Sequence, residues 1–421
     1  MMRSEPAREA FVWIWLPGAT EPVVAGKLEG GGGTIHFNYG QSYLERVKDS
    51  TPAIAIYEPE LPLRRGVLPL VDGLSMPGCI RDAAPDAWGR RVIINKKWGL
   101  KGTDADTAVL DELTYLLESG SDRIGALDFQ RSPSEYSPRA YTNASIEELL
   151  EAAERVEKGL PLSPELGLAL FHGSSIGGAR PKALVEDQGK KYIAKFSSGT
   201  DLYSVVKAEF VAMRLAALAG LEVAAVRLGQ AAHKDVLLVE RFDREKTAAG
   251  WSRKAMVSAL TLFGLDELAA RYASYEELAA IIRHRFAHPK NTLRELFSRL
   301  VFNVLCGNTD DHARNHAAFW DGQTLRLTPA YDICPQARTG YEASQAMRIT
   351  GADNLSQLAT CLAAAHHFLL GKDEAHAIID RVAAAIETHW DGVCAEARLS
   401  ETDKNLLWGR QFFNPFSIIG R

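Results

Sequence analysis

The polar residues that follow the apolar segment 293–306 are the part of the sequence best suited to chemistry. Within GNTDDHARNHAAFW, five side chains that ionise or carry an amide stand within eight residues: Asn308, Asp310, Asp311, His312 and Asn315. Packing gives a loop no reason to hold so many polar groups, whereas loops on rigid scaffolds often carry catalytic residues. An aspartate can accept a proton from an alcohol, and amide and carboxylate oxygens can hold Mg²⁺.

The spacing of Asp310 and Asn315 matches the D-x-x-x-x-N of a protein-kinase catalytic loop. In that loop the Asp accepts the proton of the substrate hydroxyl and the Asn holds magnesium. Asp332, in LTPAYDICP just after a short predicted strand, lies where a kinase places its second magnesium-binding aspartate. The alternative is a solvated loop whose Asn and Asp side chains cap a helix end. Asp332 favours the kinase interpretation because it adds a second metal ligand.

A lysine upstream strengthens this interpretation. Lys195, in KYIAKFSS, alternates with apolar residues on a predicted strand, and Glu209 lies on the helix that follows. Kinases pair such a lysine with a helix glutamate and use it to neutralise phosphate charge. By itself, a lysine on a strand is far more often simply an exposed residue. The order of lysine, glutamate, aspartate, asparagine and aspartate along the chain favours a kinase. The end of the strand in VLLVERFDR would then offer backbone hydrogen-bonding groups to a purine ring. The alternative is a strand end whose charged side chains simply form an ion pair.

The Gly-rich segment HGSSIGGARPKALVED can place backbone N–H groups around phosphates. It is not a P-loop, because Ala179 stands where that motif needs lysine, and it is not G-x-G-x-x-G. Residues 173–177 match the G-x-S-x-G of a serine hydrolase, but Arg180-Pro181 and a strand follow where that motif needs a helix. His312 and His316 suggest a zinc site as another alternative, which lacks the glutamate of H-E-x-x-H and a third ligand.

The composition is that of an ordinary folded protein. The 421 residues, 46% hydrophobic and 24% charged, exclude a largely disordered or collagen-like chain and suggest two or three domains or lobes. The formal net charge of -5 argues against a protein that coats nucleic acid. The five scattered cysteines form no CxxC pair, which fits a reducing compartment. We find no signal peptide and no membrane-spanning run, so we expect a cytoplasmic protein.

The elements that position these motifs change character along the chain. Alternation and helix signals predict short strands over about 11–70, helices over about 86–98 and 105–118, a Pro/Ser-rich linker over 130–140, and a helix from the capping box Ser145–Glu148 to near Gly159. Residues 166–245 predict strands around a single helix, and the chain beyond about 251 is mostly helical. We therefore expect an α+β protein with a β-rich N-terminal lobe, a mainly helical C-terminal lobe and a cleft between them.

Over nearly its whole length the sequence resembles the HipA family, the serine/threonine-kinase toxins of bacterial type II toxin–antitoxin pairs. The resemblance rests on motifs in the family's order: APDAWGRRVI, LLESGSDRIGALDF, SSIGGARPKALV, YIAKF, LLVERFDR, GNTDDHARNH and LTPAYDICP. It implies a two-lobed protein-kinase-like fold. The N-terminal subdomain would span 1–130, the nucleotide-binding part of the N-lobe 131–250, and the helical kinase lobe 251–421.

The resemblance also implies a role for individual residues. Asp310 would be the catalytic base, Asn315 and Asp332 would hold magnesium, and Ser175 would be the autophosphorylated serine that shuts the enzyme off. The implied ATP contacts are Gly177, Gly178, Ala179, Arg180, Pro181 and Lys182 in the loop over the phosphates, then Lys195, Glu240, Arg241, Phe242, His312, Ala313, Arg314, Asn315, Tyr331 and Asp332. The chain departs from the family at Asp311, often Gly, and at Arg180-Pro181, elsewhere Gln and Glu; neither change removes a required part.

The partners are implied by the resemblance alone. They are a protein substrate in translation, such as an aminoacyl-tRNA synthetase, and a small helix-turn-helix antitoxin through which the chain would contact operator DNA indirectly. Two alternatives stay open. One is a nucleotide-binding pseudokinase that acts as a repressor subunit, and the other is a small-molecule phosphotransferase. The intact set of Lys195, Asp310, Asn315 and Asp332 argues against a pseudokinase.

Overall fold

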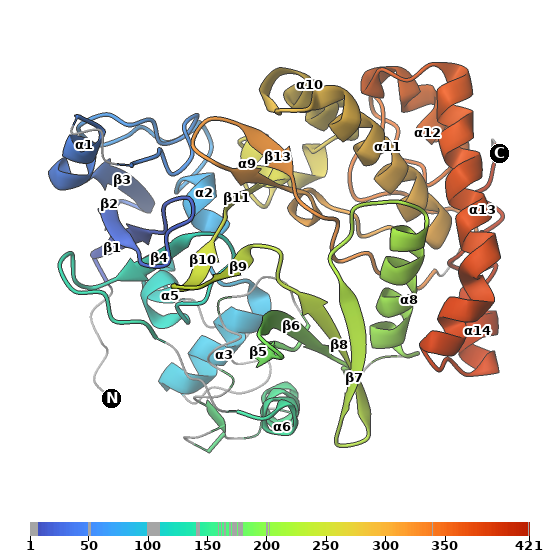
Figure 1. Ribbon diagram of the computed structural model, residues 1–421, viewed down its shortest axis with the longest axis horizontal. Coiled ribbons are helices and arrows are strands. Elements are labelled where there is room, and N and C mark those ends of the chain that lie inside the picture. Colours follow the sequence, from blue (N-terminus) through green and yellow to red (C-terminus); the bar gives the residue numbers. More distant parts are fainter. Residues whose placement is uncertain are drawn as a thin grey trace.

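The structure is a computed structural model. It describes residues 7–48, 52–98, 110–139, 144–158, 180–198, 203–338 and 340–419, together with the isolated positions 160, 162–163, 166–167, 170, 175, 201 and 421. Figure 1 shows an N-terminal sheet at the left, a middle sheet at the lower centre and a block of helices at the right. None of the described helices is both long and apolar enough to cross a bilayer.

The N-terminal sheet is antiparallel, with the strand order β3-β2-β1-β4. In β1, Ala10, Val12 and Ile14 are fully buried, as alternation on a strand with one covered face requires. Gly26 of β2 stands opposite Val12, and a Cβ there would collide with the Phe37 ring and the Asn38 carbonyl. The elements of this region are β1 (Glu9–Ile14), β2 (Val23–Gly31), β3 (Thr34–Tyr39), β4 (Leu127–Gln130), α1 (Gln41–Lys48), α2 (Gly78–Arg81), α3 (Ala87–Trp98) and α5 (Glu112–Glu118).

The middle sheet has the order β5-β6-β8-β7 and is covered on both faces. Leu237 and Val239 of β8 pack into the core that includes α8, whereas Val236 and Leu238 pack into the core that includes α6. A strand that is buried on both faces is continuously apolar, which explains the run VLLV. The elements are α6 (Ile146–Glu157), β5 (Lys182–Asp187), β6 (Lys190–Phe196), α8 (Val205–Leu218), β7 (Val226–Ala231) and β8 (Lys234–Glu240).

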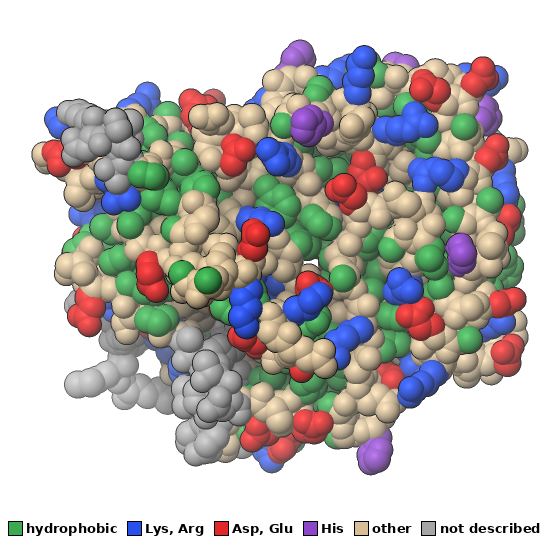
Figure 2. Space-filling view, in the orientation of Figure 1, with side chains coloured by type: hydrophobic (Ala, Val, Ile, Leu, Met, Phe, Trp, Pro, Cys, Tyr) green, Lys and Arg blue, Asp and Glu red, His purple; other side chains and the backbone are tan. Residues whose placement is uncertain are grey.

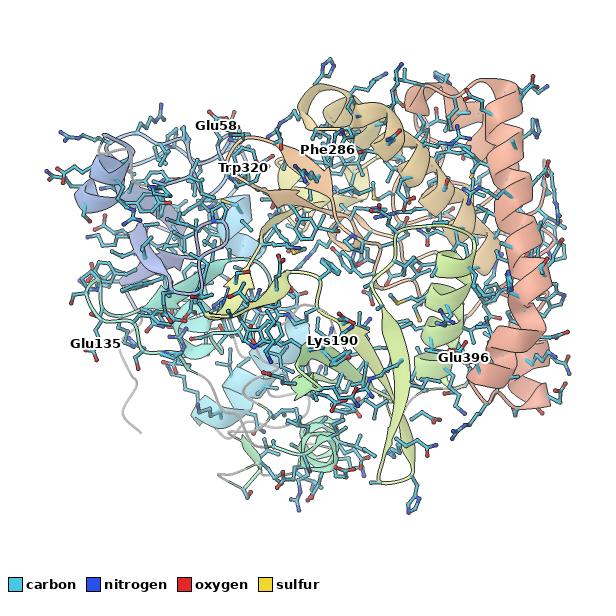
Figure 3. All side chains as sticks on the ribbon, in the orientation of Figure 1. Glu58, Glu135, Lys190, Phe286, Trp320 and Glu396 are labelled. Atoms are coloured by element: carbon cyan, nitrogen blue, oxygen red, sulfur yellow. The ribbon has the colours of Figure 1, made fainter. Side chains whose placement is uncertain are left out.

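The C-terminal region combines helices with a small antiparallel sheet of order β11-β12-β13, preceded by the hairpin β9–β10. Figure 3 shows Trp320 of β12 and Phe286, the residue after α10, near each other; both adjoin Leu325 of β13. The elements are β9 (Arg244–Thr247), β10 (Gly250–Arg253), β11 (Ala255–Ser258), α9 (Ala259–Leu262), η2 (Ala269–Tyr272), α10 (Tyr275–Arg285), α11 (Pro289–Cys306), η3 (Ala313–Asn315), β12 (Ala317–Trp320), β13 (Leu325–Leu327), α12 (Leu358–Ala364), η4 (Ala365–Phe368), α13 (Lys372–Glu396) and α14 (Glu401–Leu407).

Several expected elements are present. The capping box of Ser145 and Glu148 opens α6, and α8 ends just before Gly220, which adopts a left-handed conformation. Within 11–70, where the sequence predicts short strands, the segment PAIAIY at 52–57 is one of those expected and is wrong, because it forms no strand. Its amides at Ile54 and Ile56 bond instead to tyrosine hydroxyls of the N-terminal region. The mostly helical C-terminal half also contains β11 and β12, which are too short for alternation to reveal, and β13, the short strand expected before Asp332.

Candidate active site

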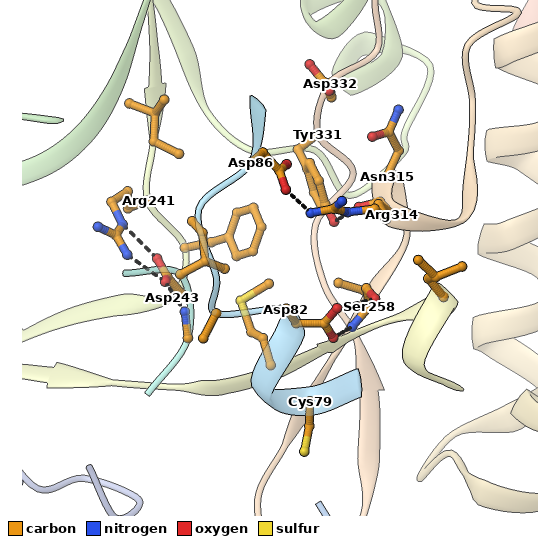
Figure 4. A pocket seen from close by; sticks show the side chains of 18 of the residues that line it. Cys79, Asp82, Asp86, Arg241, Asp243, Ser258, Arg314, Asn315, Tyr331 and Asp332 are labelled. Carbon is orange, nitrogen blue, oxygen red and sulfur yellow. Dashed lines mark hydrogen bonds and ion pairs between the residues drawn. The ribbon is translucent and has the colours of Figure 1, made fainter. Parts of the chain in front are cut away.

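A cavity of about 370 Å³ lies where the N-terminal region, the middle sheet and the C-terminal helices meet. Figure 4 shows it from close by, with Asp332 and Asn315 at one end and Cys79 at the other. The residues of the kinase motifs that line it are Lys182, Lys195, Glu240, Arg241, Phe242, His312, Ala313, Arg314, Asn315, Tyr331 and Asp332. Motifs that are up to 150 residues apart in the sequence therefore share one cavity.

Lys195 of β6 lies between two carboxylates. Its Nζ is 2.5 Å from Oε1 of Glu209, on α8, and it also donates to Asp332. The pairing with Glu209 that the sequence suggests is therefore present. Burial alone would lower the pKa of Lys195, but Asp332 and Glu209 together raise it above its usual value. The same lysine holds the pKa of Asp332 well below its usual range. Both groups are charged at neutral pH.

A second lysine, Lys182, opens β5 directly opposite Lys195 in the strand register. The residue is 6% exposed and lines the same cavity. Burial, assisted by the positive charge of Lys195, lowers the pKa of Lys182 to about 8. The cavity thus presents one permanently charged lysine and one that titrates near neutral pH, both suited to anionic phosphates.

The catalytic-loop segment begins where α11 ends. Gly307 stops the helix in a left-handed conformation, against the backbone of Gln411. The loop then folds on itself: the His312 amide donates to the Asp310 carbonyl at 2.9 Å, and the Asn315 amide donates to the His312 carbonyl at 2.8 Å. The Asp310 side chain is exposed beside the cavity, and partial burial raises its pKa.

Asn315 and Asp332 present oxygen atoms that suit a hard cation. The Asn315 side-chain amide donates from Nδ2 to the Asp310 carbonyl at 3.2 Å, so its Oδ1 remains available as a ligand. Asp332 has a positive φ of 59°, an unusual conformation for a residue with a side chain, and it lies at the cavity wall. Nδ1 of His312, also at the cavity, is buried without a hydrogen-bond partner among the described residues. These groups fit Mg²⁺ and a polar ligand.

Residues 240–242 connect the middle sheet to the rest of the chain. Glu240 pairs with Lys190 at 2.7 Å, at the β5–β6 turn (Figure 3), and the Arg241 guanidinium bonds to Asp243 at 2.8 Å (Figure 4). Their charged groups are thus engaged in ion pairs. The Phe242 ring lies 5.7 Å from that of Tyr331. What this segment can offer a nucleotide is its backbone and the Phe242 ring.

Some residues that the sequence suggested take other positions. Arg180 pairs with Asp201 at 2.5 Å and, like Pro181, is absent from the lining of the cavity. Gly177, Gly178 and Ala179 lie outside the described residues, as do Gly173, Ser174 and Ile176 of the G-x-S-x-G match. Ser175 is described and buried, and its Oγ has no hydrogen-bond partner there.

The zinc alternative finds no support in the described residues, where no three His, Cys, Asp or Glu side chains converge as metal ligands. His316 contacts Asp311 instead, at 2.9 Å.

The sequence does not predict the ion pairs that join the catalytic loop to the N-terminal region. Arg314 forms ion pairs with Asp86 (Figure 4) and, at 2.9 Å, with Glu267. The Arg314 carbonyl also accepts a hydrogen bond from the Tyr331 hydroxyl at 2.7 Å. Asp86 lies in the motif APDAWGRRVI, so that motif was a signal. Glu267 lies in no motif, and nothing in the sequence marks it.

A family profile and two relatives show what this chain is similar to in sequence. The profile of the HipA-like C-terminal domain matches residues 174–390, more than half of the chain. A Sinorhizobium fredii protein named "Putative kinase Y4mE" is 30% identical over 167 residues, 38% of each chain. The "Serine/threonine-protein kinase toxin HipA" of Shewanella oneidensis is 25% identical over 187 residues, 38% of this chain and 42% of the relative. The chain thus spans less than half the length of these two relatives.

A solved structure gives the fold of the whole chain. HipA of Shewanella oneidensis, in its complex with HipB and operator DNA, superposes with a TM-score of 0.66 at 18% identity, over 91% of this chain and 92% of that one. The two-lobed, protein-kinase-like α+β fold that the sequence suggests is therefore confirmed. With the domain profile, the shared fold and the motifs at one cavity, the chain belongs to the HipA-like family.

Proposed function

We propose that the chain is an ATP- and magnesium-dependent protein kinase that phosphorylates serine or threonine. The main support is that Lys195, Asn315 and Asp332 line one cavity. Glu209 pairs with Lys195 there. In this proposal residues 1–130 are the N-terminal subdomain, 131–250 carry the nucleotide-binding part, and 251–421 are the helical lobe. The names of the relatives, two kinases, support the same activity.

The residues of the cavity divide the work of phosphoryl transfer. Lys195 and Lys182 bind phosphate oxygens, residues 240–242 and Tyr331 receive the base, and Asn315 and Asp332 are the ligands for Mg²⁺. When bound, the metal neutralises phosphate charge. Asp310 is exposed beside the cavity and accepts the proton of the attacking hydroxyl. The partly raised pKa of Asp310 favours this role because it strengthens the base. Glu209 keeps Lys195 in place.

Intact-mass analysis of the purified chain, with and without Mg-ATP, tests the activity. If the chain is a kinase, the chain itself or an added protein substrate should gain about 80 mass units per phosphate. Acid hydrolysis of the product should then release phosphoserine or phosphothreonine. The Asp310→Asn variant is the matched control, because it removes the base and little else. Transfer to a metabolite alone would identify a small-molecule phosphotransferase. ATP binding without any transfer would identify a pseudokinase.

Ser175 is the proposed site of autophosphorylation. Its Oγ is buried without a partner among the described residues. A phosphate adds about −1.5 to −2 charges at neutral pH, which this buried position has no room to hydrate. We therefore expect the phosphorylated segment to leave its position. ATP binding should then weaken, because the implied phosphate contacts Gly177 and Gly178 closely follow Ser175 in the chain. Phosphopeptide mapping after incubation with ATP tests the site; phosphate confined to Ser174, or a Ser175→Asp variant with full ATP affinity, contradicts it.

A small helix-turn-helix antitoxin is the proposed partner, and operator DNA would be contacted through it. The supporting comparison is the HipA structure with HipB and operator DNA. The net charge of -5 supports indirect contact, as does the face in Figure 2, where basic and acidic side chains alternate. In a gel-shift assay we expect the chain to retard operator DNA only with the antitoxin. Tight binding of DNA by the chain alone would contradict this.

The proposed substrate is a protein of translation, such as an aminoacyl-tRNA synthetase. This rests on the family alone. Incubating the chain and Mg-ATP with a purified set of synthetases tests it, with the Asp310→Asn variant as the control. Phosphorylation of none of them, by a chain that phosphorylates itself, would contradict the substrate and leave the kinase activity standing.

A further inference from the structure

We infer that Tyr275, Asp311 and His316 form a buried clamp that positions Asp310 and Asn315 for phosphoryl transfer. The three side chains belong to two parts of the chain: Tyr275 opens α10, and the other two lie in the catalytic-loop segment. None of the three lines the cavity. They are positioning residues, and their meaning for catalysis rests on the function proposed above.

The three groups bond to one another in the interior. Oδ1 of Asp311 lies 2.9 Å from Nε2 of His316, and Oδ2 of the same carboxylate accepts a hydrogen bond from the Tyr275 hydroxyl. The Tyr275 and His316 rings pack edge to face at 5.4 Å. Tyr275 is fully buried, and the other two are 2–3% exposed. Burial alone would raise the pKa of Asp311, but His316 holds it below its usual range, so the carboxylate is charged.

Asp311 and His316 directly adjoin the proposed catalytic and metal-binding residues in the sequence. Asp311 directly follows Asp310, the proposed base, and His316 directly follows Asn315, the proposed metal ligand. Holding Asp311 to His316 therefore fixes the separation of the two residues that precede them. The neighbours alternate in direction: Asp310 is exposed, whereas Asp311 is buried beneath it.

Both ends of the clamp are also held by backbone hydrogen bonds. The Tyr275 amide donates to the Arg348 carbonyl at 2.8 Å, and the His316 carbonyl accepts from the Ala259 amide at 2.7 Å, where α9 begins. The side-chain contacts of the clamp and these backbone bonds hold the catalytic loop in place before substrate arrives, so the loop needs little reorganisation on binding. Misplacement of reacting groups by about 1 Å can cost on the order of 100-fold in rate, so such a clamp has a measurable effect.

The Tyr275→Phe variant tests the clamp, because it removes one hydroxyl and keeps the ring packing. Asp311→Asn is the second variant, which removes the charge. Tyr39→Phe is the matched control: that tyrosine is also buried, and its hydroxyl donates to the Leu61 carbonyl at 2.7 Å in the N-terminal region. All three are compared with the wild type by hydrogen exchange, by thermal melting, and by kcat and its dependence on Mg²⁺ concentration.

We expect the His312 and Asn315 amides to exchange about 10- to 100-fold faster in both clamp variants, because a hydrogen bond to a buried charge is lost. We also expect kcat to fall about 10- to 100-fold, with a higher Mg²⁺ requirement and little change in the KM for ATP. Tyr39→Phe should lower the melting temperature and leave both readouts unchanged.

Unchanged exchange at His312 and Asn315 in Tyr275→Phe would overturn the clamp. So would unchanged kcat and Mg²⁺ dependence in a variant that melts earlier, because that is the behaviour of a purely structural residue. A wild type that transfers no phosphate contradicts the proposed function instead. The exchange comparison needs no activity, so it still decides whether the clamp holds the loop.

Discussion

Two groups of charged residues in this protein differ in how far their side chains are exposed. The linking cluster, Asp122, Arg241, Asp243 and Arg244, joins the N-terminal region to the segment after β8. The cleft cluster, Lys195, Glu209 and Asp332, lies at the cavity. In the linking cluster two arginines bond to two aspartates, with distances of 2.8–3.1 Å. The cleft cluster has one lysine between two carboxylates.

The exposed fractions of the side chains show this difference. The arginine side chains of the linking cluster are at most 1% exposed, whereas that of Asp332 is 45% exposed. Burial alone would raise the pKa of Asp243, but Arg241 and Arg244 lower it to about 2, so this network is fully ionised. The buried network of the linking cluster joins two parts of the chain. Asp332, a half-exposed carboxylate at the cavity, can take up a cation as well as bond to Lys195.

The largest expected effect is on catalysis. Asp310→Asn should lower kcat by about 100- to 10,000-fold, because the carboxylate that accepts the proton is lost. The melting temperature should not change, since the Asp310 side chain is exposed and no described side chain forms an ion pair with its carboxylate. Phosphate incorporation and thermal melting measure the two effects. A variant with wild-type kcat would show that Asp310 is not the base.

The linking cluster should respond in the opposite way. Arg244→Met leaves Asp243 and Asp122 buried with too few partners, which should lower the free energy of unfolding by about 3–5 kcal/mol. Urea unfolding measures this. The control is Arg155→Met, which breaks an exposed pair on α6 and should cost at most about 1 kcal/mol. ATP affinity of the folded protein should stay unchanged; an Arg244→Met protein as stable as the wild type would contradict a structural role.

Asp332→Asn should weaken ATP binding in the presence of Mg²⁺ by about 10- to 100-fold, because one charged ligand is lost. Without Mg²⁺ the affinity should hold or improve, since a carboxylate that repels phosphate is gone. Lys195 retains Glu209 as a partner, so stability should change little. Titration calorimetry with and without the metal measures both cases. Equal loss in both would mean that Asp332 acts on the fold or on Lys195 and not on a cation.

Most of the cleft cluster follows from the sequence, because its signals are local. Strand alternation places Lys195, and the next helix places Glu209. The linking cluster does not follow, because Arg241 and Asp122 are 119 residues apart. The same holds for the separate ion pair of Arg314 with Asp86, which are 228 residues apart. No periodicity relates such partners, since tertiary packing alone brings them together. The absent strand at 52–57 also depends on tertiary packing, because the hydroxyls of Tyr43 and Tyr39, 11 and 17 residues away, take the amides of Ile54 and Ile56.

The smallest expected effect concerns Lys182, which adjoins the cleft cluster. Unlike the arginines of the linking cluster, Lys182 can lose its charge near neutral pH. Its pKa of about 8 means that the free protein loses this charge as the pH rises above 8. Bound phosphates favour the charged form, so ATP binding above pH 8 must take up a proton. Affinity should therefore fall by at most about tenfold per pH unit between pH 8 and 9, and hold between pH 6 and 7. Titration calorimetry in buffers of different ionisation enthalpy counts the proton.

Lys182→Met should bind ATP more weakly and remove this pH dependence, whereas Lys190→Met, at the exposed β5–β6 turn, should keep it. If Lys182→Met retained the wild-type pH profile, the titrating group would lie elsewhere in the cavity.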